Sequence, residues 1–92
     1  MELEYESEGL EITVKDDIIT QIVSGVRTVS VGERVRSRGS MYLRSGRFGT
    51  VTALYDPHKE NSSGIIDVLW DGDSYSKRME FRDLIWILSW VM

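Results

Sequence analysis

The chain has 92 residues, of which 41% are hydrophobic and 28% are charged, and its formal net charge is −4. This length fits one domain, and the composition excludes a chain that is disordered throughout. The absence of cysteine and the acidic N-terminus indicate a cytoplasmic protein, and the longest apolar run, residues 84–88, is too short to cross a membrane.

The first 25 residues are rich in acids and read as an extension of the main domain. Leu10, Ile12 and Val14 alternate with polar residues, which predicts a half-buried strand. The glutamates at 2, 4, 6 and 8 also alternate and indicate either an edge strand or a frayed arm. Residues 18–23 fit a short helix capped by the preceding aspartates or a continuing strand. The extension, residues 1–25, is expected to pack on a barrel formed by residues 26–92.

From residue 26 onward the signals are those of strands joined by turns. The expected strands are 26–31, 34–36, 48–54, 65–70, 74–81 and 85–91, with loops at 38–46 and 56–64, a hairpin turn at 71–73 and one helical turn at 82–84. Short strands at this spacing predict a small all-β barrel or sandwich.

Four segments resemble the SH3-like barrel superfamily, with the KOW, Tudor and Mind-bomb-type domains as the nearest variants. They are Val31-Gly32-Glu33-Arg34-Val35, Gly46-Arg47-Phe48-Gly49-Thr50-Val51, Asp67-Val68-Leu69-Trp70-Asp71-Gly72 and Phe81-Arg82-Asp83-Leu84. The resemblance covers roughly residues 30–88. It implies an all-β, SH3-like barrel of five to six antiparallel strands, preceded here by an extension with a strand and a possible short helix. Such barrels serve many functions, so the fold does not fix one.

The residues that catalysis requires are scarce. His58 is the only histidine, it lies in a polar loop, and there is no cysteine. One imidazole without a thiol cannot build the usual transition-metal site. Asp71 and Asp73 fail as a calcium loop, because the twelfth position from Asp71 is Arg82 instead of glutamate. The sequence therefore predicts a protein that is not an enzyme and uses no metal or cofactor.

Arginines gather in the middle of the chain. Arg34, Arg36 and Arg38 alternate, so they should share one face of a strand, with Arg44 and Arg47 across the following loop. One interpretation is a docking surface for an acidic partner or for phosphates. The alternative is that these arginines pair with the protein's own acids, particularly the N-terminal glutamates. The acidic arm would then lie on the basic face as an internal mimic of an acidic ligand.

Aromatic residues mark a second candidate surface. Tudor-type readers hold a methylated cation in an aromatic cage helped by an acid. The resemblance implies Tyr42 and Tyr75 as the exposed rim of such a site and Asp73 or Asp71 as its acid. Phe48 and Trp70 are expected in the core instead.

The C-terminal residues 85–92 are apolar on both faces of their expected strand. Either the N-terminal extension covers the second face, or a homodimer forms through this strand. Taken together, the sequence predicts a protein- or peptide-binding module that uses the Arg34–Arg47 face and the tyrosine rim. The alternative is a nucleic-acid-binding module that uses the same arginines on phosphates.

Overall fold

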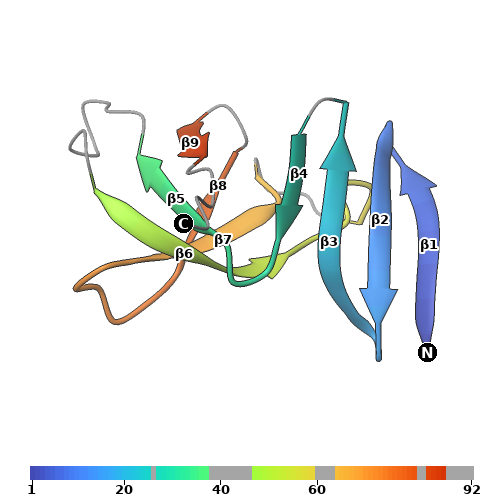
Figure 1. Ribbon diagram of the computed structural model, residues 1–92, viewed down its shortest axis with the longest axis horizontal. Coiled ribbons are helices and arrows are strands. Elements are labelled where there is room, and N and C mark those ends of the chain that lie inside the picture. The colour runs from blue at the N-terminus through green and yellow to red at the C-terminus, as the bar shows by residue number, and fades with distance from the viewer. Residues whose placement is uncertain (26, 38–46, 60–63, 81–82, 87–92) are drawn as a thin grey trace, which may run out of the picture.

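A computed structural model describes residues 1–25, 27–37, 47–59, 64–80 and 83–86 of the chain. These residues form strands arranged in two antiparallel sheets that lie side by side (Figure 1). The first sheet has the order β1-β2-β3-β4 and the second the order β8-β7-β6-β5-β9. The strands are β1 (Glu2–Ser7), β2 (Leu10–Lys15), β3 (Ile18–Ser24), β4 (Arg27–Ser30), β5 (Arg34–Ser37), β6 (Phe48–Leu54), β7 (Ile66–Trp70), β8 (Lys77–Met79) and β9 (Leu84–Trp86). The all-β prediction is confirmed.

Two-residue turns generate the first sheet. Glu8-Gly9 joins β1 to β2 with φ values of 51° and 80°, and Asp16-Asp17 joins β2 to β3 with φ values of 53° and 67°. Positive φ at both central residues is the geometry of a type I′ turn, whose twist matches that of the paired strands. The short helix offered for residues 18–23 is wrong, because the aspartates form a hairpin turn and do not cap a helix.

Close packing of backbone on side chains holds the second sheet together. Gly49 of β6 lies opposite Trp70 of β7, and a Cβ at position 49 would come within 2.7 Å of Val68 and 2.8 Å of Trp70. Trp70 is fully buried, as expected, whereas Phe48 is 43% exposed, so its expected place in the core is wrong. The glycine leaves the space that the indole ring occupies.

Two details of the predicted barrel are wrong. The described part of the chain has nine strands instead of five to six, because the turns at residues 8–9 and 16–17 make a whole sheet of the N-terminal residues. Neither sheet closes into a barrel there, since β8 pairs only with β7 and β9 pairs only with β5. The turn at 71–73 is present, with the N–H of Asp73 donating to the carbonyl of Trp70 at 2.9 Å, but the returning strand is only Lys77–Met79.

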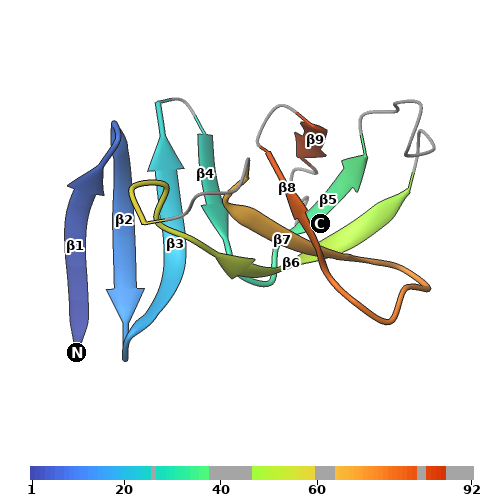
Figure 2. The same cartoon turned by 180° about the vertical axis from the view of Figure 1, so that it is seen from behind.

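One apolar core joins the two sheets. It contains Ile12, Ile22 and Val29 from the first sheet together with buried residues of the second: Val35, Val51, Leu54, Ile66, Val68, Trp70, Met79 and Leu84. The connection from β4 to β5 is tied to β6, because the N–H of Gly32 donates to Val51 and the N–H of Val51 donates to Glu33, each at 2.8 Å. From behind, β6 runs from the second sheet toward β3 of the first (Figure 2).

The end of the chain is described only in part. β9 pairs antiparallel with β5, and residues 87–92, where most of the proposed dimer strand falls, lie outside the described residues. The expected helical turn at 82–84 is described only at its end, where the N–H of Asp83 donates to the carbonyl of Glu80 at 3.0 Å. Across the described ranges, no helix has the length and apolar character needed to span a membrane.

Candidate functional site

Two of the predicted arginines meet two aspartates at the β7–β8 turn. The Nη1 and Nη2 atoms of Arg34 donate to the two carboxylate oxygens of Asp71 at 2.9 and 2.8 Å, a bidentate ion pair. The hydrogen bond from Arg34 is the main cause that lowers the pKa of Asp71. Arg47 donates to Asp73 at 3.1 Å, and its guanidinium lies 5.9 Å from the centre of the Trp70 ring.

Carboxylates of the same chain neutralise the charges of Arg34 and Arg47. Arg34 and Arg47 pair with acids of the protein itself, but the acids are Asp71 and Asp73 and not the N-terminal glutamates. The turn after β7 and strand β1 lie at opposite ends of the molecule (Figure 1). Strand β1 therefore does not cover Arg34 or Arg47, and for these two arginines the structure contradicts the internal mimic.

The remaining predicted site residues are placed as follows. Arg36 lies two positions from Arg34 on β5, and no hydrogen bond or ion pair joins its side chain to the described part of the chain. Tyr75 is 83% exposed after the β7–β8 turn. Arg38, Tyr42 and Arg44 lie outside the described residues. The structure thus brings together Arg34, Arg47, Asp71 and Asp73, and it does not describe the tyrosine rim as a whole.

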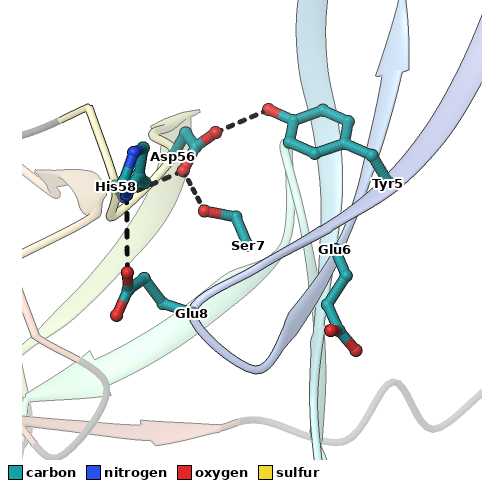
Figure 3. A pocket seen from close by; sticks show the side chains of 6 residues that line it. All are labelled: Tyr5, Glu6, Ser7, Glu8, Asp56 and His58. Atoms are coloured by element: carbon teal, nitrogen blue, oxygen red, sulfur yellow. Dashed lines mark hydrogen bonds and ion pairs between the residues drawn. The ribbon is translucent and has the colours of Figure 1, made fainter.

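A second polar cluster links the first strand to the loop after β6 (Figure 3). Asp56 is only 5% exposed, and its carboxylate accepts hydrogen bonds from the hydroxyls of Tyr5, at 2.9 Å, and Ser7. It also accepts one from the backbone N–H of His58 at 2.9 Å, which makes an Asx turn. Asp56 therefore fastens β1 to the second half of the chain.

The hydrogen bonds decide the charge state of this carboxylate. Burial alone would raise the pKa of Asp56, but the donors from Ser7, His58 and Tyr5 outweigh it and lower the pKa. Burial and the bond to Asp56 raise the pKa of Tyr5 above its usual value of 10.0. Asp56 is thus held as a carboxylate that serves only as an acceptor.

Serine, histidine and carboxylates meet here, but they do not form a catalytic triad. The Ser7 hydroxyl donates to Asp56 and not to the imidazole, and the Nδ1 atom of His58 faces Glu8 at 3.5 Å. A triad needs the histidine between the serine and the acid, so that it can take the hydroxyl proton. The cluster instead attaches β1 to the loop after β6 by hydrogen bonds. Among the residues that line the hollow of about 390 Å³ beside it, none is an activated nucleophile.

Strand β1 itself is the free edge of the first sheet. It pairs with β2 on one side, and no described strand pairs with its other side. Glu2, Glu4 and Glu6 share one face of the strand, and Leu3, Tyr5 and Ser7 share the other. Leu3 is 58% exposed and Tyr5 is 38% exposed. An apolar pair thus stands beside unpaired backbone at the end of the molecule.

A hollow of about 410 Å³ lies beneath this edge. The side chains that line it come from both halves of the chain: Leu3, Tyr5, Val14, Asp17, Ile19, Tyr55, Asp56 and Lys59. The hollow is therefore largely apolar on the side of the first sheet, with Lys59 as its cation. Any strand that joined β1 would place alternate side chains at its rim.

Sequence reasoning missed this edge as a site, although its signals were present. The alternating glutamates indicated an edge strand, but Leu3 and Tyr5 between them were not weighed as its second face. Asp56 before Pro57 is a typical turn residue, and the turn explains its bond to His58. Its bonds to Tyr5 and Ser7 join residues 51 and 49 positions away, which no local pattern reveals.

The site carries no group of three or more histidine, cysteine, aspartate or glutamate side chains arranged to hold a metal ion, within the ranges described. Comparison of the chain with protein-family models, curated proteins and solved structures found no match.

Proposed function

We propose that this protein is a non-enzymatic module that binds a protein or peptide, and that strand β1 is the surface it uses. The observation that carries the proposal is the free β1 edge. An extended peptide can add to such an edge as a further strand, with backbone hydrogen bonds for affinity and alternate side chains for specificity. The six residues of β1 give an edge of ordinary strand length.

The hydrogen-bond pattern shows which backbone groups would take part. The N–H of Asp16 donates to the carbonyl of Met1 at 3.3 Å, so residues 1 and 16, which continue the register of β1 and β2, form a bonding pair of this ladder. In an antiparallel ladder the bonding pairs alternate, so the odd residues of β1 face β2. The N–H and carbonyl groups of Glu2, Glu4 and Glu6 then face outward at the free edge.

The arrangement of the second sheet supports the proposed relation to SH3-like barrels. Strands β5 to β8 follow one another as a meander, and β9 returns beside β5. The fastening at Asp56 supports the proposed role of the first sheet, because it holds β1 firmly on the rest of the protein. A rigid edge loses little conformational entropy when a partner binds.

Nucleic-acid binding through the arginines receives less support. Arg34 and Arg47 are already paired with carboxylates, and a phosphate would have to displace them. The net charge of −4 also repels polyanions at long range. We therefore treat nucleic-acid binding as an outcome to be tested.

The test of the proposed function is a proline in the edge. Glu4→Pro removes the outward N–H at the middle of β1 and leaves the ladder to β2 intact, because proline is tolerated where the N–H faces solvent. The probe is a displayed library of random extended peptides as long as β1. We expect the protein to enrich a set of peptides, and Glu4→Pro to bind that set at least about tenfold more weakly.

Glu4→Ala is the matched control, because it removes the same carboxylate and keeps the N–H. It should retain most of the binding to the enriched peptides. Thermal melts establish that both variants fold. A folded Glu4→Pro variant that binds the enriched peptides as well as the parent protein would overturn the proposal, and so would a selection that enriches no peptide.

A further inference from the structure

The chemistry of the partner follows from the two faces of β1. This inference rests on the proposed function, because it concerns what the β1 edge selects. An antiparallel strand added to β1 would place residues directly opposite Glu2, Glu4 and Glu6, on the glutamate face. The residues between them would lie on the face of Leu3 and Tyr5, at the rim of the hollow.

On the β2 side, the glutamate face has a cation opposite only one of its three acids. Glu2 lies opposite Lys15, but Glu4 lies opposite Thr13, and Glu6 lies opposite another acid, Glu11. No ion pair joins any of the three β1 glutamates to the residues that the structure describes. Like charges directly across a sheet repel, whereas opposite charges stabilise the pairing. The place where these acids can gain a counter-charge is the open side of β1.

The opposite face of β1, which carries Leu3 and Tyr5, favours different side chains in a partner strand. Leu3, Val14 and Ile19 line the hollow there and favour an apolar neighbour. Lys59 also lines the hollow, but so do the acids Asp17 and Asp56, so the preference of this face comes from its apolar side chains. The two faces of β1 therefore favour a partner strand with cations at one set of alternate positions and apolar side chains at the other.

We propose that β1 binds an extended segment in which lysine or arginine alternates with apolar residues. A second copy of the same strand is a poor occupant. Antiparallel pairing of two β1 strands about Glu4 would set glutamate against glutamate along the whole row. The edge is thus closed to self-association by the same charges that attract a basic strand.

Synthetic peptides as long as β1 test this inference by fluorescence anisotropy. One alternates lysine with valine, one glutamine with valine, and one lysine with serine. We expect the lysine–valine peptide to bind about tenfold more tightly than the glutamine–valine peptide at low salt, and this advantage to shrink as salt rises. The lysine–serine peptide should bind more weakly than the lysine–valine peptide, because it has no apolar side chain to place in the hollow.

The variant Glu2→Gln/Glu4→Gln/Glu6→Gln separates charge selection from strand addition. It should bind the lysine–valine and glutamine–valine peptides equally. Equal binding of these two peptides by the parent protein would overturn the inference and leave the proposed function standing. If Glu4→Pro fails to weaken any peptide that binds, or no peptide binds, the proposed function fails as well. A dimer of the parent protein at neutral pH by sedimentation, absent in Glu4→Pro, would also overturn the inference.

Discussion

Asp56 shows how one buried side chain can organise distant parts of a chain. Its carboxylate takes three donors, two from β1 and one from its own loop. A buried carboxylate without donors would cost several kcal/mol, and here the donors repay that cost. Because they favour the charged form, they lower the pKa of Asp56 below its ordinary value of 3.8.

Replacement of this residue tests the fastening. Asp56→Asn should destabilise the protein at pH 7 by about 1–3 kcal/mol, because the amide nitrogen cannot accept a hydroxyl proton. A group whose pKa is lowered on folding stabilises the native state above its unfolded pKa and loses that effect as pH falls. The difference between parent and variant should therefore shrink as the pH falls below about 3.8 and through the lowered pKa.

Urea unfolding between pH 7 and pH 2 measures both effects. Glu2→Gln serves as control, because this exposed carboxylate makes no hydrogen bond to the described residues, and its unfolding midpoint should follow the parent's. A difference for Asp56→Asn that stays constant over the whole range would show that the charge of Asp56 contributes nothing.

At the scale of elements, the hairpin turns give the first sheet its register. Asp17 takes φ of 67° at the second position of its turn, where glycine is the preferred residue. Gly9 occupies the equivalent position in the preceding hairpin, with φ of 80° and no atom near its missing Cβ. The chain therefore offers a favourable and an unfavourable residue in the same kind of turn.

Exchanging the two residue types should have opposite effects on stability. Asp17→Gly should raise the free energy of unfolding by up to about 1 kcal/mol, because it removes the strain of a side chain at positive φ. Gly9→Asp should lower it by a similar amount. Thermal unfolding of both variants measures the two shifts. Changes of the same sign would mean that the turns do not control stability through backbone strain.

The turns also show what sequence reasoning can reach. Period-two alternation predicted β2, because side-chain direction alone sets that pattern, and an apolar run predicted β7. The helix alternative for residues 18–23 arose because two aspartates suit a helix N-terminus as well as a type I′ turn, and only the pairing of Lys15 with Ile18 decides between them. Barrel closure depends on which edges pair, and edge pairing leaves no local signal.

The candidate site was predictable in part for a related reason. The charge pattern predicted Arg34 and Arg47, the resemblance implied Asp73, and the structure places these residues at the β7–β8 turn together with Asp71. Their ion pairing requires β5, the start of β6 and the turn after β7 to lie close together in space. Residue spacing along the sequence does not show this. The β1 edge was anticipated as a strand, but its open side is a property of the sheet order.

At the scale of the whole molecule, the arginine–aspartate pairs are far from the glutamates of β1. The β7–β8 turn, which carries the aspartates of these pairs, lies at one end of the molecule, and strand β1 lies at the other (Figure 1). Each arginine pair is exposed or half-exposed, so it is screened by solvent and can exchange partners. We therefore expect the acids of the β7–β8 turn to compete with any polyanion for these arginines.

Removing those acids tests their control over the arginines. Asp71→Asn/Asp73→Asn should bind random single-stranded DNA more tightly than the parent. The logarithm of its binding constant should fall with the logarithm of the salt concentration, with a slope of about −0.7 for each phosphate engaged. Glu2→Gln/Glu4→Gln removes the same amount of charge at the other end of the molecule. It should bind the DNA much more weakly than Asp71→Asn/Asp73→Asn does. Anisotropy titrations over a salt series measure all three proteins. Equal gains in the two variants would show that net charge alone, and not release of the arginines, sets the binding.

The local pairing of the first sheet has a consequence for how the protein folds. Two-residue turns let β1, β2 and β3 pair in sequence with little loop entropy, whereas the bond from Tyr5 to Asp56 spans 51 positions. The first sheet is therefore expected to form early, while the remainder of the chain is still unfolded. Its edge is then open when nascent chains are crowded together. The row of glutamates keeps such early sheets from joining one another into aggregates.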